Sequence, residues 1–102
     1  ELVNKEELEN KYLPWGCLEN RPLMRGVYAD GQQKWEANLC DEANKQFRLL
    51  LKMNPNDNIG ARYAEKATGQ RMNSTEFEKQ FIREDETGSY YNVDILTEWI
   101  EQ

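Results

Sequence analysis

Histidine is absent from this chain of 102 residues. Its absence removes the side chain that most often serves as general base and metal ligand near neutral pH. The two cysteines, Cys17 and Cys40, lie far apart and match no metal-binding spacing. We therefore predict no metal and no cofactor. We expect both thiols to be reduced in a cytoplasmic protein, and a disulfide is the alternative if the protein is exported.

Long apolar runs are also missing, and hydrophobic residues make up only 38% of the chain. A membrane-spanning helix needs about 20 consecutive apolar residues, so none is predicted. The formal net charge of -6 argues against nucleic-acid binding, which depends on Lys and Arg neutralising phosphates. We expect residues 1–102 to form one small domain. The chain begins with Glu1 rather than methionine, so it is compatible with a segment of a longer protein.

Catalytic constellations are equally scarce. The best enzyme hypothesis would use the neighbouring carboxylates of Glu84, Asp85 and Glu86. Consecutive acids on a charged loop point in different directions, and nothing in the sequence suggests a pocket that excludes water around them. Because no glycine-rich phosphate-binding loop is present either, we predict that the chain is not an enzyme.

Helical periodicity is what the sequence contains. Alternation of apolar and polar residues does not extend beyond a few positions, so no strand is predicted. Residues 83–88 are expected to be a charged, solvated loop. Five or six helices joined by short loops are expected, over residues 1–12, 23–37, 41–53, 59–69, 75–82 and 92–101.

The stretch from Ala43 to Tyr63 organises these helices. Phe47 belongs to an apolar helix face that should end near Met53, because the residue before Pro55 is pushed out of helical geometry. Asp57 then offers a carboxylate to cap the next helix. So short a connection predicts two antiparallel helices.

Other local signals predict helix starts and packing. Asn20 is a candidate cap with Pro22 in the first turn, and Thr75 with Glu78 resembles a capping box. Gly31 costs about 1 kcal/mol in a helix interior relative to alanine, so we expect a close helix crossing there. Trp15 either packs beneath the next helix or anchors a partner.

The spacing of Gly31, Ala43, Phe47 and Pro55 resembles that of the tetratricopeptide repeat, a helix–turn–helix unit of about 34 residues. The stretches ENRPLMRG and NPNDNIGARY are also similar to those of tetratricopeptide-like proteins. The best unit covers residues 24–57. A degenerate unit covers residues 58–91 and a final helix covers residues 92–101. The second unit departs from the pattern at three positions, Glu65, Phe77 and Ser89.

This resemblance implies an all-α fold, in which antiparallel helix hairpins stack as a short right-handed solenoid. It also implies a peptide-binding groove lined by the first helix of each unit. The residues expected to face that groove are Arg25, Tyr28, Gln32, Trp35, Arg62 and Lys66. The three cations among them would suit a carboxylate or an acidic segment. The alternative is ordinary solvated charge, with Arg62 paired to Asp57 or Glu65.

The function expected from these features is a non-catalytic interaction module that binds a protein or peptide partner. The alternative is a structural or self-associating domain. In that case the wide apolar face of the last helix, with Val93, Leu96 and Trp99, would pack on a second copy or on a missing domain. A homodimer is therefore an alternative, whereas no nucleic acid or membrane is expected as a partner.

Overall fold

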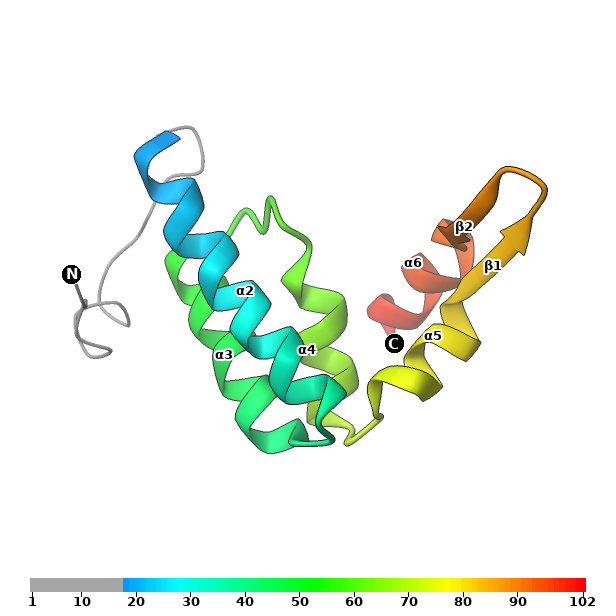
Figure 1. The fold of residues 1–102 in the computed structure, drawn as a ribbon, viewed down its shortest axis with the longest axis horizontal. Coiled ribbons are helices and arrows are strands. Elements are labelled where there is room, and N and C mark those ends of the chain that lie inside the picture. Colours follow the sequence, from blue (N-terminus) through cyan, green and yellow to red (C-terminus); the bar gives the residue numbers. More distant parts are fainter. Residues whose placement is uncertain (1–17) are drawn as a thin grey trace.

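The structure is a computed structural model that describes residues 18–102. The helix expected over residues 1–12, together with Trp15 and Cys17, lies outside the described residues. The described part is mostly helical with one small sheet (Figure 1). Its elements in chain order are the short 3-10 helix η1 (Leu18–Asn20), α2 (Arg21–Glu36), α3 (Cys40–Met53), α4 (Ala61–Gly69), α5 (Ser74–Phe81), β1 (Ile82–Asp85), β2 (Gly88–Tyr91) and α6 (Val93–Glu101).

These elements form two groups that diverge like the arms of a V (Figure 1). The first group contains α2, α3 and α4 side by side, and the second contains α5, the β1–β2 hairpin and α6. The C-terminal end of α6 returns toward α4 and closes the lower part of the V. Among residues 18–102, no helix combines the length and the apolar character needed to cross a bilayer.

The α2–α3 hairpin is held by close packing at Gly31. A β-carbon at this position would lie 2.8 Å from Cε1 of Phe47, a ring that is fully buried. The close approach predicted at Gly31 is therefore present, and the partner is an aromatic ring. Asn38 turns the chain between the two helices with a left-handed φ of 64°, a conformation that asparagine tolerates better than most residues.

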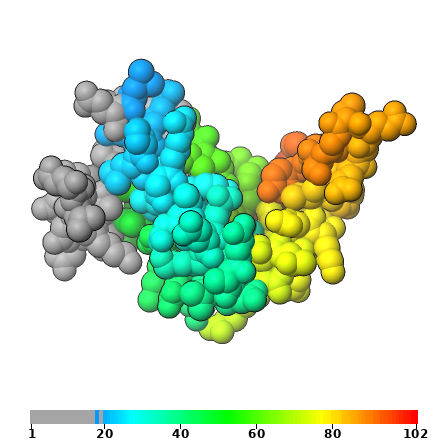
Figure 2. All heavy atoms as spheres, in the orientation of Figure 1, coloured from blue at the N-terminus to red at the C-terminus, as the bar shows by residue number. Residues whose placement is uncertain are grey.

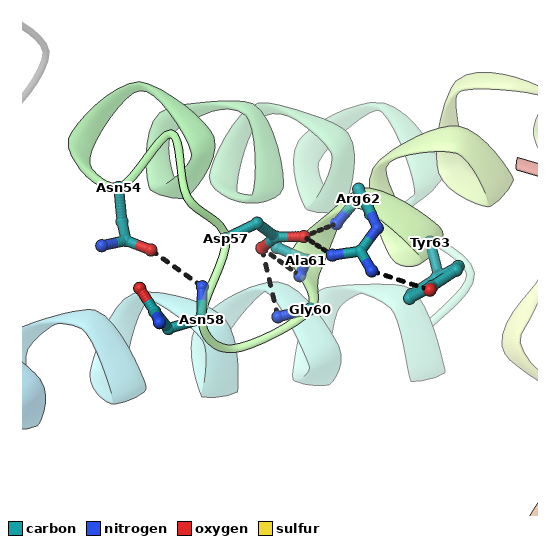
Figure 3. A network of polar contacts seen from close by, with 7 residues as sticks. All are labelled: Asn54, Asp57, Asn58, Gly60, Ala61, Arg62 and Tyr63. Carbon is teal, nitrogen blue, oxygen red and sulfur yellow. Dashed lines mark hydrogen bonds and ion pairs between the residues drawn. The ribbon is translucent and has the colours of Figure 1, made fainter. Parts of the chain in front are cut away.

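The turn after α3 follows the prediction in outline. The helix ends at Met53 as expected, and Asn54 accepts a bond from the backbone N–H of Asn58. The carboxylate of Asp57 accepts bonds from the backbone N–H groups of the next helix and its approach: Gly60, Ala61 and Arg62 (Figure 3). These are donors that helix geometry leaves without partners. The helix begins at Ala61, later than predicted.

Two helix caps differ from the prediction. Asn20 is itself helical in φ and ψ and makes no side-chain cap, so α2 follows directly on η1 with Pro22 in its first turn. The capping box of α5 is formed by Asn73 and Glu76 rather than by Thr75 and Glu78. The correct box lies two residues earlier because asparagine caps as well as serine or threonine does.

The predictions that residues 83–88 form a loop and that no strand is present were wrong. Strands β1 and β2 form an antiparallel hairpin whose register pairs Ile82 with Tyr91 and Asp85 with Gly88. At its turn, Asp85 accepts bonds from both the backbone N–H and the hydroxyl of Thr87. Gly88 then adopts a φ of 127°, which a residue with a side chain rarely takes.

The two groups share a core of aromatic rings. Phe77 of α5 lies 5.2 Å from Trp35 of α2 and 4.8 Å from Phe81, measured between ring centroids. Phe81 in turn lies 4.9 Å from Trp99 of α6. Tilted ring pairs at such distances each contribute about 0.5–1.5 kcal/mol beyond their buried area. The aromatic series therefore connects α2 to α6.

Candidate functional site

A cavity of about 310 Å³ lies between the two groups of elements. Its walls come from α2, from the start of α4 and the loop before it, from α5, from the end of β2 and from the first half of α6. Figure 2 shows that the molecular surface is hollowed between the green and orange segments. The size is at the lower end of the range of small-molecule and side-chain pockets.

The α2 wall carries three of the predicted site residues. Tyr28, Gln32 and Trp35 all line the cavity, because their spacing puts them on one face of the helix. Trp35 is 6% exposed, and its indole N–H donates to the backbone oxygen of Met72 over 2.9 Å. This bond fixes the ring where α2 meets the loop before α5.

The α4 wall is set by the Asp57 network (Figure 3). Asp57 holds Gly60 and Ala61 through their backbone N–H groups, at 3.1 and 2.6 Å. Arg62 pairs with the same carboxylate at 2.9 Å and also donates to the hydroxyl of Tyr63 at 2.8 Å. Gly60 and Tyr63 both line the cavity, so this capping network shapes one wall.

The other three predicted site residues, Arg25, Arg62 and Lys66, are not among the lining residues. Arg62 is bound to Asp57, and this hydrogen bond raises its pKa further above the ordinary value. The ammonium of Lys66 donates to the backbone oxygen of Trp99 and lies 5.0 Å from the centroid of its ring. The structure therefore does not gather the expected basic strip at the cavity.

The wall opposite α2 was not predicted to be part of the groove, although the last helix was expected to offer Val93 and Leu96 for packing on a second copy or a missing domain. It consists of Phe77 from α5, Tyr91 from β2, and Val93 and Leu96 from α6. Tyr91 and Val93 remain 50% and 67% exposed. The usable signal was the run Tyr90–Val93, where apolar side chains follow a charged segment, but their position depends on a hairpin that the sequence did not reveal.

The pKa values of two tyrosines at the cavity, Tyr28 and Tyr91, are raised by their surroundings. Burial raises the pKa of Tyr28, and the proximity of Tyr91 raises it further. Burial and the charge of Glu78 raise the pKa of Tyr91. Both hydroxyls therefore stay protonated at neutral pH and can serve as neutral donors and acceptors.

Two carboxylates complete the lining. Glu36 ends α2 and Glu78 lies in α5, and both side chains are exposed. The remaining polar groups are the amide of Gln32 and the hydroxyl of Ser74. In the part of the chain that the structure describes, neither lysine nor arginine lines this cavity. The site is thus an aromatic and aliphatic hollow with a negative rim.

Other candidate chemistry lies elsewhere. Within residues 18–102 no group of three or more Cys, Asp and Glu side chains is arranged to hold a metal ion. The acids of the enzyme hypothesis lie on the exposed hairpin, where Asp85 is bound to Thr87. Cys40 is half-buried, and burial raises the pKa of its thiol. Whether it pairs with Cys17 lies outside the described residues.

Comparison with known proteins found no match among family models, curated proteins or solved structures. The tetratricopeptide resemblance therefore stays a prediction based on the spacing of Gly31, Ala43, Phe47 and Pro55. The function has to be argued from the geometry and chemistry of the cavity.

Proposed function

We propose that this chain is a non-catalytic interaction module that holds a short segment of a partner protein in the cavity between α2 and the β2–α6 wall. The observation that carries the proposal is the lining itself, with aromatic residues from both groups: Tyr28, Trp35, Tyr63, Phe77 and Tyr91. Aromatic anchors are the commonest hot spots of protein interfaces. A hollow of this size takes one or two side chains of an extended segment.

The tetratricopeptide-like interpretation is part of this proposal. The antiparallel packing of α2 on α3, and of α3 on α4, supports a unit over residues 24–57. In such a unit the first helix faces the groove, and α2 supplies Tyr28, Gln32 and Trp35 to the cavity. The short α4 and the hairpin after α5 would then end the stack rather than continue a solenoid.

A displayed library of random peptides tests the proposal and requires no identified partner. The chain would be used for selection beside Gln32→Trp, which places a bulky ring at the cavity mouth. Gln33→Trp is the matched control, because Gln33 is exposed on the same helix and does not line the cavity. Circular dichroism would establish that all three chains are equally helical.

The expected result is a family of peptides that bind the native chain and Gln33→Trp but lose at least about tenfold in affinity for Gln32→Trp, since most interface energy lies in a few buried anchors. Peptides that bind all three chains equally would place binding elsewhere. An empty selection would contradict the proposal.

The alternative function, self-association, would use the same hollow with a second copy as occupant. Val93, which is 67% exposed beside the cavity, is the observation that favours it. Sedimentation equilibrium of the native chain and Gln32→Trp separates the two functions. A dimer that dissociates in Gln32→Trp would indicate self-association, whereas a monomer in both would favour a separate partner.

A further inference from the structure

The charges around the cavity are one-sided. Glu36 and Glu78 reach it from α2 and α5, and among residues 18–102 no lysine or arginine lines it. The nearby cation on α4, Arg62, is held by Asp57 at 2.9 Å. Lys66 donates to the backbone oxygen at the end of α6. The carboxylates of Glu36 and Glu78 are therefore the ionised side chains among the described lining residues.

The aromatic rings of the cavity walls also favour a positively charged ligand. The face of an aromatic ring carries negative partial charge and attracts a cation placed within about 6 Å of its centroid. Tyr28 and Tyr91 present such rings together with protonated hydroxyls, whereas the ring of Tyr63 already has the guanidinium of Arg62 4.5 Å from its centroid. The charge of Glu78 reaches this wall, because it contributes to the raised pKa of Tyr91.

We propose that the bound segment carries a lysine or arginine side chain next to an apolar residue. The cation would be held between Glu36 and Glu78, against the rings of Tyr28 and Tyr91. The apolar neighbour would lie on Val93 and Leu96, the aliphatic part of the lining. This inference rests on the proposed function and specifies its ligand class. It reverses the acidic ligand that Arg25, Arg62 and Lys66 suggest in the sequence.

The net charge of the whole chain agrees with this choice. At -6 the protein attracts basic segments at long range and repels acidic ones, which affects mainly the association rate. A partner of opposite charge would therefore be steered toward the molecule before the side chains reach the cavity.

The selection from random peptides supplies the first test when its pools are sequenced. The native chain is compared with Glu36→Gln/Glu78→Gln, which removes both rim charges and preserves side-chain shape. The matched control is Glu42→Gln/Glu98→Gln, which changes the net charge equally at exposed positions that do not line the cavity. We expect basic residues beside apolar ones to be enriched by the native chain and the control, and not by the rim variant.

The second test uses one selected peptide and its uncharged analogue, with arginine replaced by citrulline or lysine by norleucine. Isothermal titration calorimetry should show roughly a tenfold loss of affinity for the analogue and for the rim variant, as for a partly desolvated cation. Binding of the basic peptide should also weaken as salt is raised, and binding of the analogue should not.

The outcomes separate this inference from the proposed function. Neutral or acidic peptides that bind the native chain and Gln33→Trp but not Gln32→Trp would overturn the cationic ligand and leave the binding module intact. Equal affinity of a basic peptide for the rim variant and for its charge control would also overturn the cationic ligand and leave the binding module intact. Failure to select any peptide that depends on the cavity would overturn both.

Discussion

Gly31 and Phe47 set how closely α2 and α3 approach each other. Phe47 has no exposed surface, and its ring lies 5.6 Å from that of Tyr28 and 6.0 Å from that of Trp35. The glycine leaves room for the ring, and the ring supports two residues of the cavity wall. Packing at one backbone position thus contributes to the shape of the candidate site.

Replacement of Gly31 by alanine tests this arrangement. The new β-carbon would lie 2.8 Å from Cε1 and 3.0 Å from Cζ of Phe47, so the ring or the helices must shift. Overpacking of a core costs about 1–3 kcal/mol, whereas alanine in place of glycine returns up to about 1 kcal/mol of helix propensity. We expect Gly31→Ala to lower the free energy of unfolding by about 1 kcal/mol in urea denaturation.

Gly26 provides the control on the same helix. A β-carbon there would meet nothing within 4 Å, so Gly26→Ala should raise the free energy of unfolding by up to about 1 kcal/mol. Equal effects of the two substitutions, of either sign, would mean that the contact with Phe47 does not determine the need for glycine.

At the scale of secondary-structure elements, α6 depends on a residue from another helix. No basic residue lies in its own last turn, and the carbonyls at a helix end carry partial negative charge. Lys66 of α4 supplies the missing cation by donating to the backbone oxygen of Trp99 and lying over its ring. This contact fastens α6 to the first group of helices.

Lys66→Met removes the ammonium and keeps the apolar stem. We expect the free energy of unfolding to fall by about 0.5–1.5 kcal/mol, as for a hydrogen bond reinforced by the helix dipole. Amide hydrogen exchange should become faster in the last turn of α6. Lys45→Met, at an exposed position of α3, should change stability by less than about 0.5 kcal/mol.

The same variants test the sequence-based role of Lys66. If this residue bound the partner directly, Lys66→Met would weaken binding of a selected peptide while leaving α6 as stable as in the native chain. We expect instead that Lys66→Met makes α6 less stable and leaves the affinity for the peptide nearly unchanged. A loss of peptide affinity at unchanged α6 protection would show that the structural role is secondary.

The elements that the sequence could predict are those with strong local signals. Helices α2 and α3 follow from their apolar periodicity and from Pro55, which sets the end at Met53. The hairpin could not be predicted, because its strands read IRED and GSYY and lack apolar alternation. Its existence depends on Asp85 and Gly88 at the turn and on Ile82 and Tyr91 lying over α5, which are tertiary effects.

The residues of the candidate site also divide into those that local sequence signals predict and those that tertiary contacts bring together. Tyr28, Gln32 and Trp35 were selected from the tetratricopeptide resemblance, and they line the cavity together because they lie on one face of α2. Tyr91 was missed because only the return of the chain through the hairpin brings it opposite α2. Glu78 was missed because the packing of α5 against α2 is a tertiary contact. The cations were chosen by sequence pattern, but hydrogen bonds to Asp57 and to the Trp99 carbonyl engage Arg62 and Lys66.

On the scale of the whole molecule, Phe77 is the ring that joins the two arms of the V. It lies within 6.2 Å of four other rings, measured between centroids, and these belong to α2, α5, β2 and α6: Trp35, Phe81, Tyr91 and Trp99. The contacts of α2 with α3, and of α3 with α4, do not involve it. Stability should therefore be distributed unevenly, with the second group depending more on this one ring.

Phe77→Leu tests this distribution. We expect a loss of roughly 1–2 kcal/mol from missing volume and ring contacts, felt mainly as faster amide exchange in α5 and α6. Phe47→Leu is the control, since its ring packs on Tyr28 and Trp35 within the first group. That change should accelerate exchange in α2 and α3. Equal acceleration in all helices of Phe77→Leu would mean that the described part unfolds as one unit.

Ligand binding should partly repair the defect in Phe77→Leu, because leucine keeps an apolar side chain at this lining position and the cavity has walls in both groups. A segment that contacts α2 and α6 together binds only when the arms are joined, so it stabilises that state by mass action, by about 2.7 kcal/mol at 100 times its dissociation constant. A selected peptide should therefore restore slow exchange in α6 of the variant. If the peptide protected only α2 and α3, its site would lie on the first group alone, and the cavity between the arms would not be where the partner binds.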